Sequence, residues 1–147
     1  MQRQRVLFLC TENSARSQMA EGILRNDAGD RFEVHSAGTN PTVLRTEALD
    51  VMAEIGIDIS GQFAKPVACF DGQEFDFVIT VCDHARESCP ILPGAARHLH
   101  WSFDDPAEAT GPHEERVILF RRTRDEMRDR LKSFAAEHVG LQYAMHG

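Results

Sequence analysis

The chain has 147 residues, with 23 acidic and 16 basic side chains, a formal net charge of -7 and 42% hydrophobic residues. This length fits one domain, residues 1–147, and the composition excludes a disordered, collagen-like or disulfide-scaffold protein. The acidic balance argues against a sequence-independent nucleic-acid binder, which needs a basic face. No run approaches the roughly 18 apolar residues of a membrane span, so we expect no membrane contact.

The start of the chain and its cysteines indicate the compartment. The apolar run Val6–Cys10 behind the basic start is too short for a signal-peptide core, and we therefore expect a cytoplasmic protein. Cysteines in that compartment begin as thiols, so they are reactive, metal-binding or buried rather than a disulfide framework. The four cysteines are Cys10, Cys69, Cys82 and Cys89.

The first half of the chain predicts two strand–helix pairs. Val6–Leu9 is continuously apolar, which is typical of a strand buried on both faces in a parallel sheet. Helical spacing of apolar residues then predicts a helix over Ser17–Ala28, and Phe32–Ser36 predicts a short strand. The stripe Ala48–Ile55 predicts a second helix, which Gly56 ends as a C-cap glycine.

The second half predicts two more strands and a long helix. We expect a loop over Ile57–Ala68, a buried strand over Phe75–Val81 and a shorter strand over His98–Trp101. Apolar residues between Val117 and Phe134 mark a final helix, and residues from about 138 to 147 are expected to fray.

The order of elements predicts an α/β fold, a three-layer arrangement with a four-stranded parallel sheet and helices on both faces. Parallel strands bring their C-terminal ends to one edge of the sheet, where ligands bind in such folds. Cys10 follows the first predicted strand, and Cys82 follows the third. That coincidence is the first indication of a functional site.

The segment between the first strand and the first helix has the pattern Cys, five residues, Arg, Ser. In that setting backbone N–H groups can converge on a tetrahedral oxyanion, and the helix N-terminus adds its positive dipole end. Arg16 offers a planar fork to two oxygens, and the same groups favour a thiolate at Cys10. The predicted anion-binding residues are Thr11, Glu12, Asn13, Ser14, Ala15, Arg16 and Ser17.

Two side chains of this segment, Ser17 and Asn13, have predicted supporting roles, and a third, Glu12, would oppose the binding of an anion. Ser17 can donate its hydroxyl to the sulfur of Cys10, and Asn13 can brace the loop backbone. The carboxylate of Glu12 would repel an anion, so we expect it to point outward. The alternative is a plain turn with a buried cysteine, but the position between a strand and a helix favours an anion site.

A candidate acid follows the last predicted strand, in the segment Asp104-Asp105-Pro106. Displacement at a tetrahedral centre needs a proton for the leaving oxygen, and an aspartate at the same sheet edge can supply it. The alternative is an ordinary turn, for which Asp-Asp-Pro is a common sequence.

A set of segments occurs along the chain in the order and spacing of a known family. They are Cys10–Gly22, Ser36–Gly38, Gly56–Ser60 and Asp105-Pro106, together with Val81-Cys82, Cys89–Pro93 and His100-Trp101. The first four resemble the low-molecular-weight protein tyrosine phosphatase superfamily. The last three resemble its thioredoxin-coupled arsenate reductase branch, and the similarity spans residues 5–137.

The resemblance implies an enzyme that converts arsenate to arsenite, with weak side phosphatase activity. Carried over residue by residue, Cys10 is the nucleophile, Arg16 the oxyanion clamp and Asp105 the general acid. Cys82 and Cys89 form a redox relay that thioredoxin regenerates. We expect a monomer without a cofactor, whose ligand is arsenate or a phosphate-like oxyanion.

Some reductases of this branch bind potassium beside the anion loop, with groups that match Asn13, Glu21 and Ser36. In this chain Lys65 falls near the remaining acidic ligand, and its ammonium can take the place of the ion. We therefore predict no metal.

Three other functions fit less well. A tyrosine phosphatase would share Cys10 and Arg16, but it needs aromatic walls, and Ala107-Glu108-Ala109 follow the Asp-Pro pair. A reductase that uses a small thiol and a glutaredoxin-like partner would not need a second and third cysteine. A zinc module would need closely spaced ligand pairs, and the six-residue gap between Cys82 and Cys89 is a poor match. Cys69 is expected to be a small buried residue.

The relay leads to a hypothesis about backbone movement. If the strands that precede Cys10 and Cys82 are neighbours, about 4.8 Å apart, their sulfurs can meet with modest movement. The segment from Cys82 to Cys89 tolerates a helix, in which seven residues rise ~10.5 Å. A disulfide needs Cα atoms roughly 4.4–6.8 Å apart, so this segment would have to unwind for the second disulfide to form.

Overall fold

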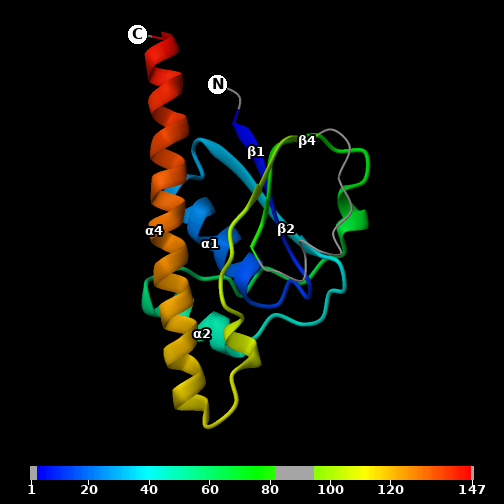
Figure 1. Ribbon diagram of the computed structural model, residues 1–147, viewed down its shortest axis with the longest axis vertical. Helices are drawn as coiled ribbons and strands as arrows, with labels where there is room; N and C mark the ends of the chain where they lie inside the picture. The colour runs from blue at the N-terminus through cyan, green and yellow to red at the C-terminus, as the bar shows by residue number, and fades with distance from the viewer. Residues whose placement is uncertain (1–2, 82–94, 147) are drawn as a thin grey trace.

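A computed structural model describes residues 3–81 and 95–146 (Figure 1). Its strands are β1 (Gln4–Cys10), β2 (Phe32–Gly38), β3 (Phe75–Thr80) and β4 (Ala95–His100). Its α-helices are α1 (Arg16–Ala28), α2 (Thr46–Glu54) and α4 (His113–His146). Two 3₁₀ helices, η1 (Val67–Phe70) and η2 (Pro106–Glu108), lie in the connections.

The four strands form one parallel sheet in the order β2-β1-β3-β4, which confirms the predicted sheet. Strand β1 lies in the middle and pairs with β2 along its whole length, from Gln4 opposite Phe32 to Cys10 opposite Gly38. On its other side β1 pairs with β3. The strands that precede Cys10 and Cys82 are therefore neighbours, which is the condition that the relay hypothesis requires, whereas Cys82 itself lies outside the described residues.

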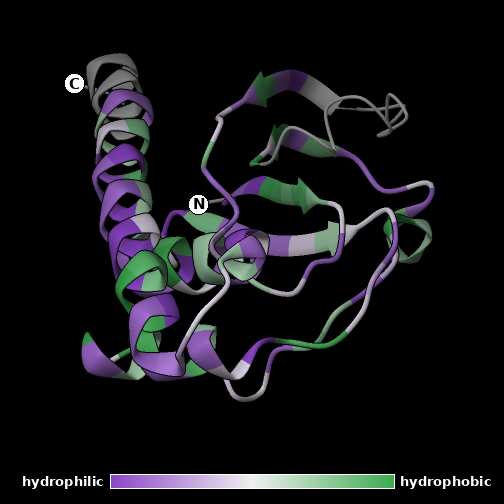
Figure 2. Cartoon of the chain, turned by 60° about the horizontal axis from the view of Figure 1, so that its bottom comes forward, coloured by the Kyte–Doolittle hydropathy of each residue, from purple (hydrophilic) through white to green (hydrophobic). Residues whose placement is uncertain are grey.

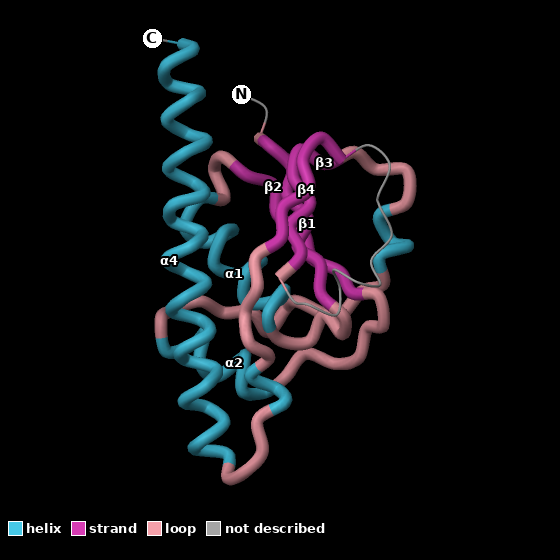
Figure 3. Tube along the Cα trace, in the orientation of Figure 1, coloured by secondary structure: helices cyan, strands magenta, loops and turns pink. Residues whose placement is uncertain are grey.

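The sheet is the middle of three layers, because side chains of β1 alternate between two cores. Val6 and Phe8 pack among residues of α1, α2 and α4, which lie together on one face of the sheet (Figures 1 and 3). Leu7 and Leu9 face the opposite side, where the described cover includes Phe70 of η1. Burial on both faces explains why this strand is continuously apolar.

Helix α4 is amphipathic and runs along the outside of this arrangement. Figure 2 shows hydrophilic residues over most of its surface, and its buried stripe includes Phe120, Met127 and Phe134. Helix α4 is assigned as far as His146, and the expected fraying of residues from about 138 to 147 stays a prediction.

Helix α2 ends where the sequence predicts. The residue after its C-cap position, Gly56, has φ +77°, a left-handed conformation that costs glycine little. The chain then continues without regular structure as far as η1, which agrees with the predicted loop except at its last residues.

Candidate active site

The loop between β1 and α1 is held from outside by the segment that follows β2. The carbonyls of Cys10 and Thr11 accept hydrogen bonds from the backbone N–H groups of Thr39 and Asn40 at 3.2 and 2.7 Å. Further along, the Glu12 carbonyl accepts from the N–H of Thr42 at 3.0 Å, and the Ser14 carbonyl from the N–H of Arg45 at 2.9 Å. These contacts turn the loop carbonyls toward the neighbouring segment, which favours an inward direction for its N–H groups.

The sulfur of Cys10 sits at the centre of a buried polar network. Its Sγ lies 2.8 Å from Ser17 Oγ and accepts a hydrogen bond from the backbone N–H of Asn13 at 3.1 Å. Asn13 Nδ2 donates to Ser17 Oγ at 2.7 Å and to Ser36 Oγ at 3.0 Å. The predicted roles of Ser17 as a partner of the sulfur and of Asn13 as a brace thus match the geometry.

Two backbone features make this loop possible. Asn13 has φ +51°, in the left-handed region that asparagine tolerates better than most residues. A Cβ at Gly38 would lie 2.6 Å from the Thr11 carbonyl oxygen and 2.9 Å from the Asn13 nitrogen, so only glycine fits there.

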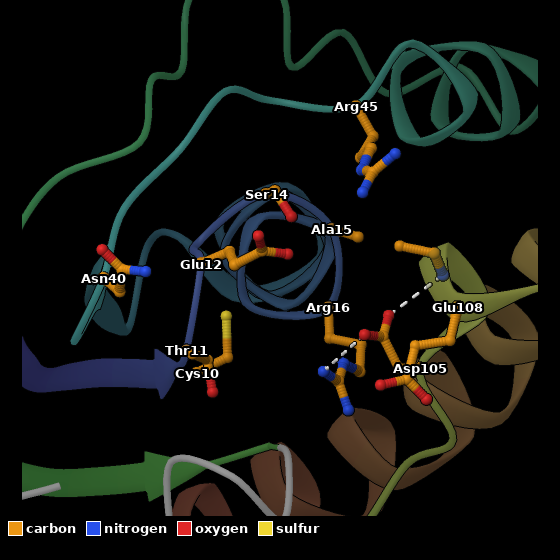
Figure 4. Close-up of a pocket in the computed structure, with 11 residues that line it drawn as sticks. Cys10, Thr11, Glu12, Ser14, Ala15, Arg16, Asn40, Arg45, Asp105 and Glu108 are labelled. Carbon is orange, nitrogen blue, oxygen red and sulfur yellow. Dashed lines mark hydrogen bonds and ion pairs between the residues drawn. The ribbon is translucent and has the colours of Figure 1, made fainter. Parts of the chain in front are cut away.

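Arg16, the first residue of α1, faces the candidate acid. Its guanidinium is buried, and Nη1 donates to the Phe103 carbonyl at 3.0 Å. Its Nη2 lies 3.3 Å from Asp105 Oδ2, and Asp105 Oδ1 accepts from the N–H of Ala107 at 3.0 Å (Figure 4). The second contact makes Asp105 the N-cap of η2 and fixes its carboxylate beside Arg16.

These groups open into a cavity of about 320 Å³. Its lining residues are Cys10, Thr11, Glu12, Ser14, Ala15, Arg16, Asn40, Arg45, Asp105, Ala107 and Glu108. Among the residues that the structure describes, none in this lining is aromatic. Asp105 therefore belongs to the site, whereas the exposed Asp104 does not.

The expectation that Glu12 points outward is wrong. Its side chain lines the cavity and is drawn over the sulfur of Cys10 in Figure 4.

A second polar cluster lies behind the loop. Ser36 Oγ donates to Glu21 Oε1, and Lys65 Nζ lies 3.8 Å from the same oxygen. The backbone N–H of Lys65 donates to Asn13 Oδ1 at 3.0 Å. Burial lowers the pKa of Lys65, and the nearby Glu21 carboxylate opposes that shift. Lys65 Nζ therefore lies beside Glu21, and the replacement of a potassium ion by this ammonium stays a prediction.

Of the three remaining cysteines, the structure describes only Cys69. Cys69 is exposed on η1, so the expectation of a buried residue is wrong. A 3₁₀ turn of four residues can bury only one side, and Phe70 takes that position. Cys82 and Cys89, and the predicted helix and unwinding between them, lie outside the described residues. In residues 3–81 and 95–146 no group of three or more His, Cys, Asp or Glu side chains could hold a metal.

Several lining residues were not predicted from the sequence. They are Asn40, Arg45, Ala107 and Glu108. Two of them reach the site only because the segment after β2 pairs with the loop, a long-range contact with no local signal. The other two follow directly from the position of Asp105, and the Asp-Pro motif could have indicated them.

The sequence also matches a known family over almost its whole length. Residues 5–142 match the family described as low molecular weight phosphotyrosine protein phosphatase. The chain belongs to this family. It is 45% identical to an arsenate reductase of Halalkalibacterium halodurans and 44% identical to one of Bacillus subtilis, in each case over 92% of this chain and 97% of the relative.

Solved structures agree with this assignment. A structure of an arsenate reductase in the phosphate binding state superposes with a TM-score of 0.78 at 29% identity, covering 91% of this chain and 98% of the other. A thioredoxin-dependent arsenate reductase of Corynebacterium glutamicum gives 0.60 at 29% identity, covering 88% and 62%. A low molecular weight protein tyrosine phosphatase from T. tengcongensis gives 0.72 at 27% identity, covering 91% and 99%. In the part of this chain that the structure describes, no helix is both long and apolar enough to cross a membrane.

Proposed function

We propose that this protein is an arsenate reductase with Cys10 as its nucleophile. The observation that carries the proposal is the setting of Cys10 Sγ, 2.8 Å from Ser17 Oγ in a cavity that also holds Arg16 and Asp105. The relatives of 44–45% identity, which are arsenate reductases, support the choice of substrate. We place the reaction in the cytoplasm and propose that the protein acts as a monomer.

Binding of arsenate uses the loop and the first turn of α1. The N–H groups of Thr11–Ser17 and the positive end of the helix dipole hold the oxyanion. Arg16 gives up its contact with Asp105 and offers two N–H groups to substrate oxygens, an arrangement that an ammonium cannot reproduce. The hydrogen bonds to Cys10 Sγ favour the thiolate that attacks.

The first chemical step forms a bond between Cys10 Sγ and arsenic. One arsenic–oxygen bond breaks, and protonated Asp105 donates its proton so that the oxygen leaves as water. The product is a covalent adduct in which arsenic is still pentavalent.

The relay then supplies two electrons. The thiolate of Cys82 attacks Cys10 Sγ, the sulfur–arsenic electron pair passes to arsenic, and trivalent arsenite leaves behind a Cys10–Cys82 disulfide. Cys89 attacks Cys82 and releases Cys10, and the dithiol of thioredoxin reduces the Cys82–Cys89 disulfide. The neighbouring positions of β1 and β3 and the thioredoxin-dependent relative from C. glutamicum support this order.

A coupled assay tests the proposal. We expect arsenate-dependent consumption of NADPH when thioredoxin and thioredoxin reductase are present, and none when thioredoxin is omitted. Replacing thioredoxin with glutathione and glutaredoxin serves as the control for the small-thiol alternative. Absence of turnover, together with rapid hydrolysis of an aryl phosphate, would identify a phosphatase instead.

The phosphatase alternative shares the loop, and we propose only weak side activity of that kind. A phenol ring needs apolar walls, and the described cavity lining is mostly polar or charged and contains no aromatic residue. Slow hydrolysis beside strong reduction is therefore the expected result.

A further inference from the structure

Arg45 is a second guanidinium in the cavity that holds Cys10 and Arg16. It lies directly before α2, is partly buried, and belongs to the cavity lining. Figure 4 shows its side chain extending from the α2 end toward the space beside Ala15, on the side of the cavity away from Cys10.

The backbone of Arg45 is tied to the anion loop. Its N–H donates to the Ser14 carbonyl at 2.9 Å, so the residue moves with the loop rather than with solvent-exposed chain. Its own carbonyl accepts from the N–H of Leu49 at 3.2 Å, in the first turn of α2. Both ends of the residue are thus anchored, which lowers the entropy cost of using its side chain for binding.

The guanidinium of Arg45 has no ion pair within 4.0 Å and no side-chain hydrogen bond in the described part of the chain. The buried carboxylate two residues on, Glu47, takes its ion pair from Arg116 at 3.1 Å. Arg45 is therefore a cation placed at a cavity. Among the described residues no carboxylate forms an ion pair with it within 4.0 Å, and its charge acts on Glu47 only from a greater distance.

The charge of the cavity makes such a cation useful. Arg16 is opposed by Asp105 at 3.3 Å, and Glu12 adds a further carboxylate to the lining. When all three are ionised, these side chains carry one positive and two negative charges, so an arsenate or phosphate that carries two negative charges would meet no net positive charge from them. We propose that Arg45 is a second guanidinium that binds the oxyanion and offsets the carboxylate of Glu12.

This role concerns binding rather than the chemical step. The bond to arsenic forms at Cys10 and the proton comes from Asp105, so the proposed role of Arg45 is to attract the charge of the oxyanion in the ground state and in the transition state alike. An interaction that is equal in the ground state and the transition state changes KM and leaves kcat unaltered. The inference depends on an oxyanion site in this cavity and extends the proposed function to a further residue.

Calorimetric titration of the reduced protein with inorganic phosphate tests the proposal without turnover. For Arg45→Gln we expect the Kd for phosphate to rise about tenfold, in line with the loss of one charge-assisted contact. Arg45→Lys keeps the charge and should recover most of the affinity. The matched control is Arg122→Gln, which removes the same charge from an exposed arginine whose partner is Glu126, and its Kd should stay within about twofold.

Steady-state kinetics with arsenate provide the second measurement. KM should rise by the same factor as Kd in Arg45→Gln, and kcat should stay within about twofold. An unchanged Kd in Arg45→Gln, or an equal weakening in Arg122→Gln, overturns the proposal. If Arg45→Gln does not fold, Arg45→Met takes its place in both measurements. An unchanged Kd in that variant, or a Glu12→Gln protein with no gain in affinity, overturns the proposal equally.

The outcomes separate this inference from the proposed function. Weakened phosphate binding in Arg45→Gln, with no arsenate turnover in any variant, would support Arg45 and refute the reductase. Normal arsenate turnover by Arg45→Gln, with unchanged Kd and KM, would support the reductase and refute the role of Arg45.

Discussion

Arg16 and Asp105 face each other across the cavity with 3.3 Å between Nη2 and Oδ2. The pair joins the first turn of α1 to η2, two segments that are almost ninety positions apart in the sequence. In the proposed reaction the same two groups need different partners, because Arg16 binds the oxyanion and Asp105 needs a proton. We therefore propose that substrate binding separates the pair and leaves Asp105 able to act as the acid.

Substitution of Asp105 by asparagine tests its proposed role as the acid. The amide of Asp105→Asn would keep a side-chain acceptor for the Ala107 N–H but has no acidic proton to donate, so the first chemical step should slow by ~10²–10⁴-fold. Binding of phosphate should stay within a few-fold, measured by calorimetry. Asp104→Asn is the matched control, because Asp104 is exposed and outside the cavity lining. Normal single-turnover rates in the Asp105 variant would show that it only caps η2.

The relay predicts a trapped intermediate. In Cys89→Ser, the first disulfide can form but cannot be passed on, so we expect one burst of arsenite per protein molecule and no further turnover. Peptide mapping of the product should find Cys10 joined to Cys82. Cys69→Ser is the control, since the exposed Cys69 has no proposed part in the relay, and it should turn over normally. Sustained thioredoxin-driven turnover by Cys89→Ser would remove Cys89 from the mechanism.

The ammonium of Lys65 predicts how the protein responds to potassium. Lys65 Nζ lies 3.8 Å from Glu21 Oε1, where a monovalent cation would otherwise compete for the carboxylate. Thermal unfolding of the parent should therefore be the same in potassium and in sodium chloride at equal ionic strength. Lys65→Gln should unfold at a lower temperature, and potassium should restore part of the loss. The idea fails if the parent is itself stabilised specifically by potassium.

The carboxylate of Glu33 is expected to account for part of the acid sensitivity of the fold. Hydrogen bonds from Arg5 and His35 lower the pKa of Glu33 from 4.5 to about 2. A carboxyl whose pKa is lower in the folded state stabilises it above the unfolded pKa, and this contribution disappears as the pH falls from about 4.5 to about 2.

Glu33→Gln should accordingly lower the free energy of unfolding at pH 7, by less than about 1 kcal/mol since the pair is partly exposed. The difference from the parent should vanish near pH 2. Urea unfolding at both pH values measures it. The exposed Glu126→Gln is the control, and an equal loss at both pH values would contradict the assignment to ionised Glu33.

The sequence predicted those features that depend on neighbouring residues. The burial of Val6–Leu9, the loop from Cys10 to Ser17 and the glycine after α2 each have a local pattern, and all three occur as expected. The position of the Glu12 side chain in the cavity lining has no such local pattern.

Other features also depend on contacts between distant segments. Arg45 reaches the cavity through the pairing of the segment after β2 with the loop, and Cys69 is exposed because Phe70 occupies the buried side of η1. The position of Arg45 and the exposure of Cys69 therefore depend on the complete fold and could not be predicted from neighbouring residues. The residues with an obvious chemical type were therefore easier to predict than the residues that surround them.

The hydrogen bonds from Thr39, Asn40, Thr42 and Arg45 to the loop carbonyls have a consequence for engineering. Because of these bonds, the curvature of the loop between β1 and α1 depends on the segment that follows β2, which begins more than twenty residues later in the sequence. A synthetic peptide with the sequence of residues 10–17, or a graft of these residues onto another strand–helix junction, would have to order its backbone alone, at ~1–2 kcal/mol per residue. A graft that is to keep the loop conformation therefore has to include residues 38–45, whose backbone N–H groups bind the loop carbonyls.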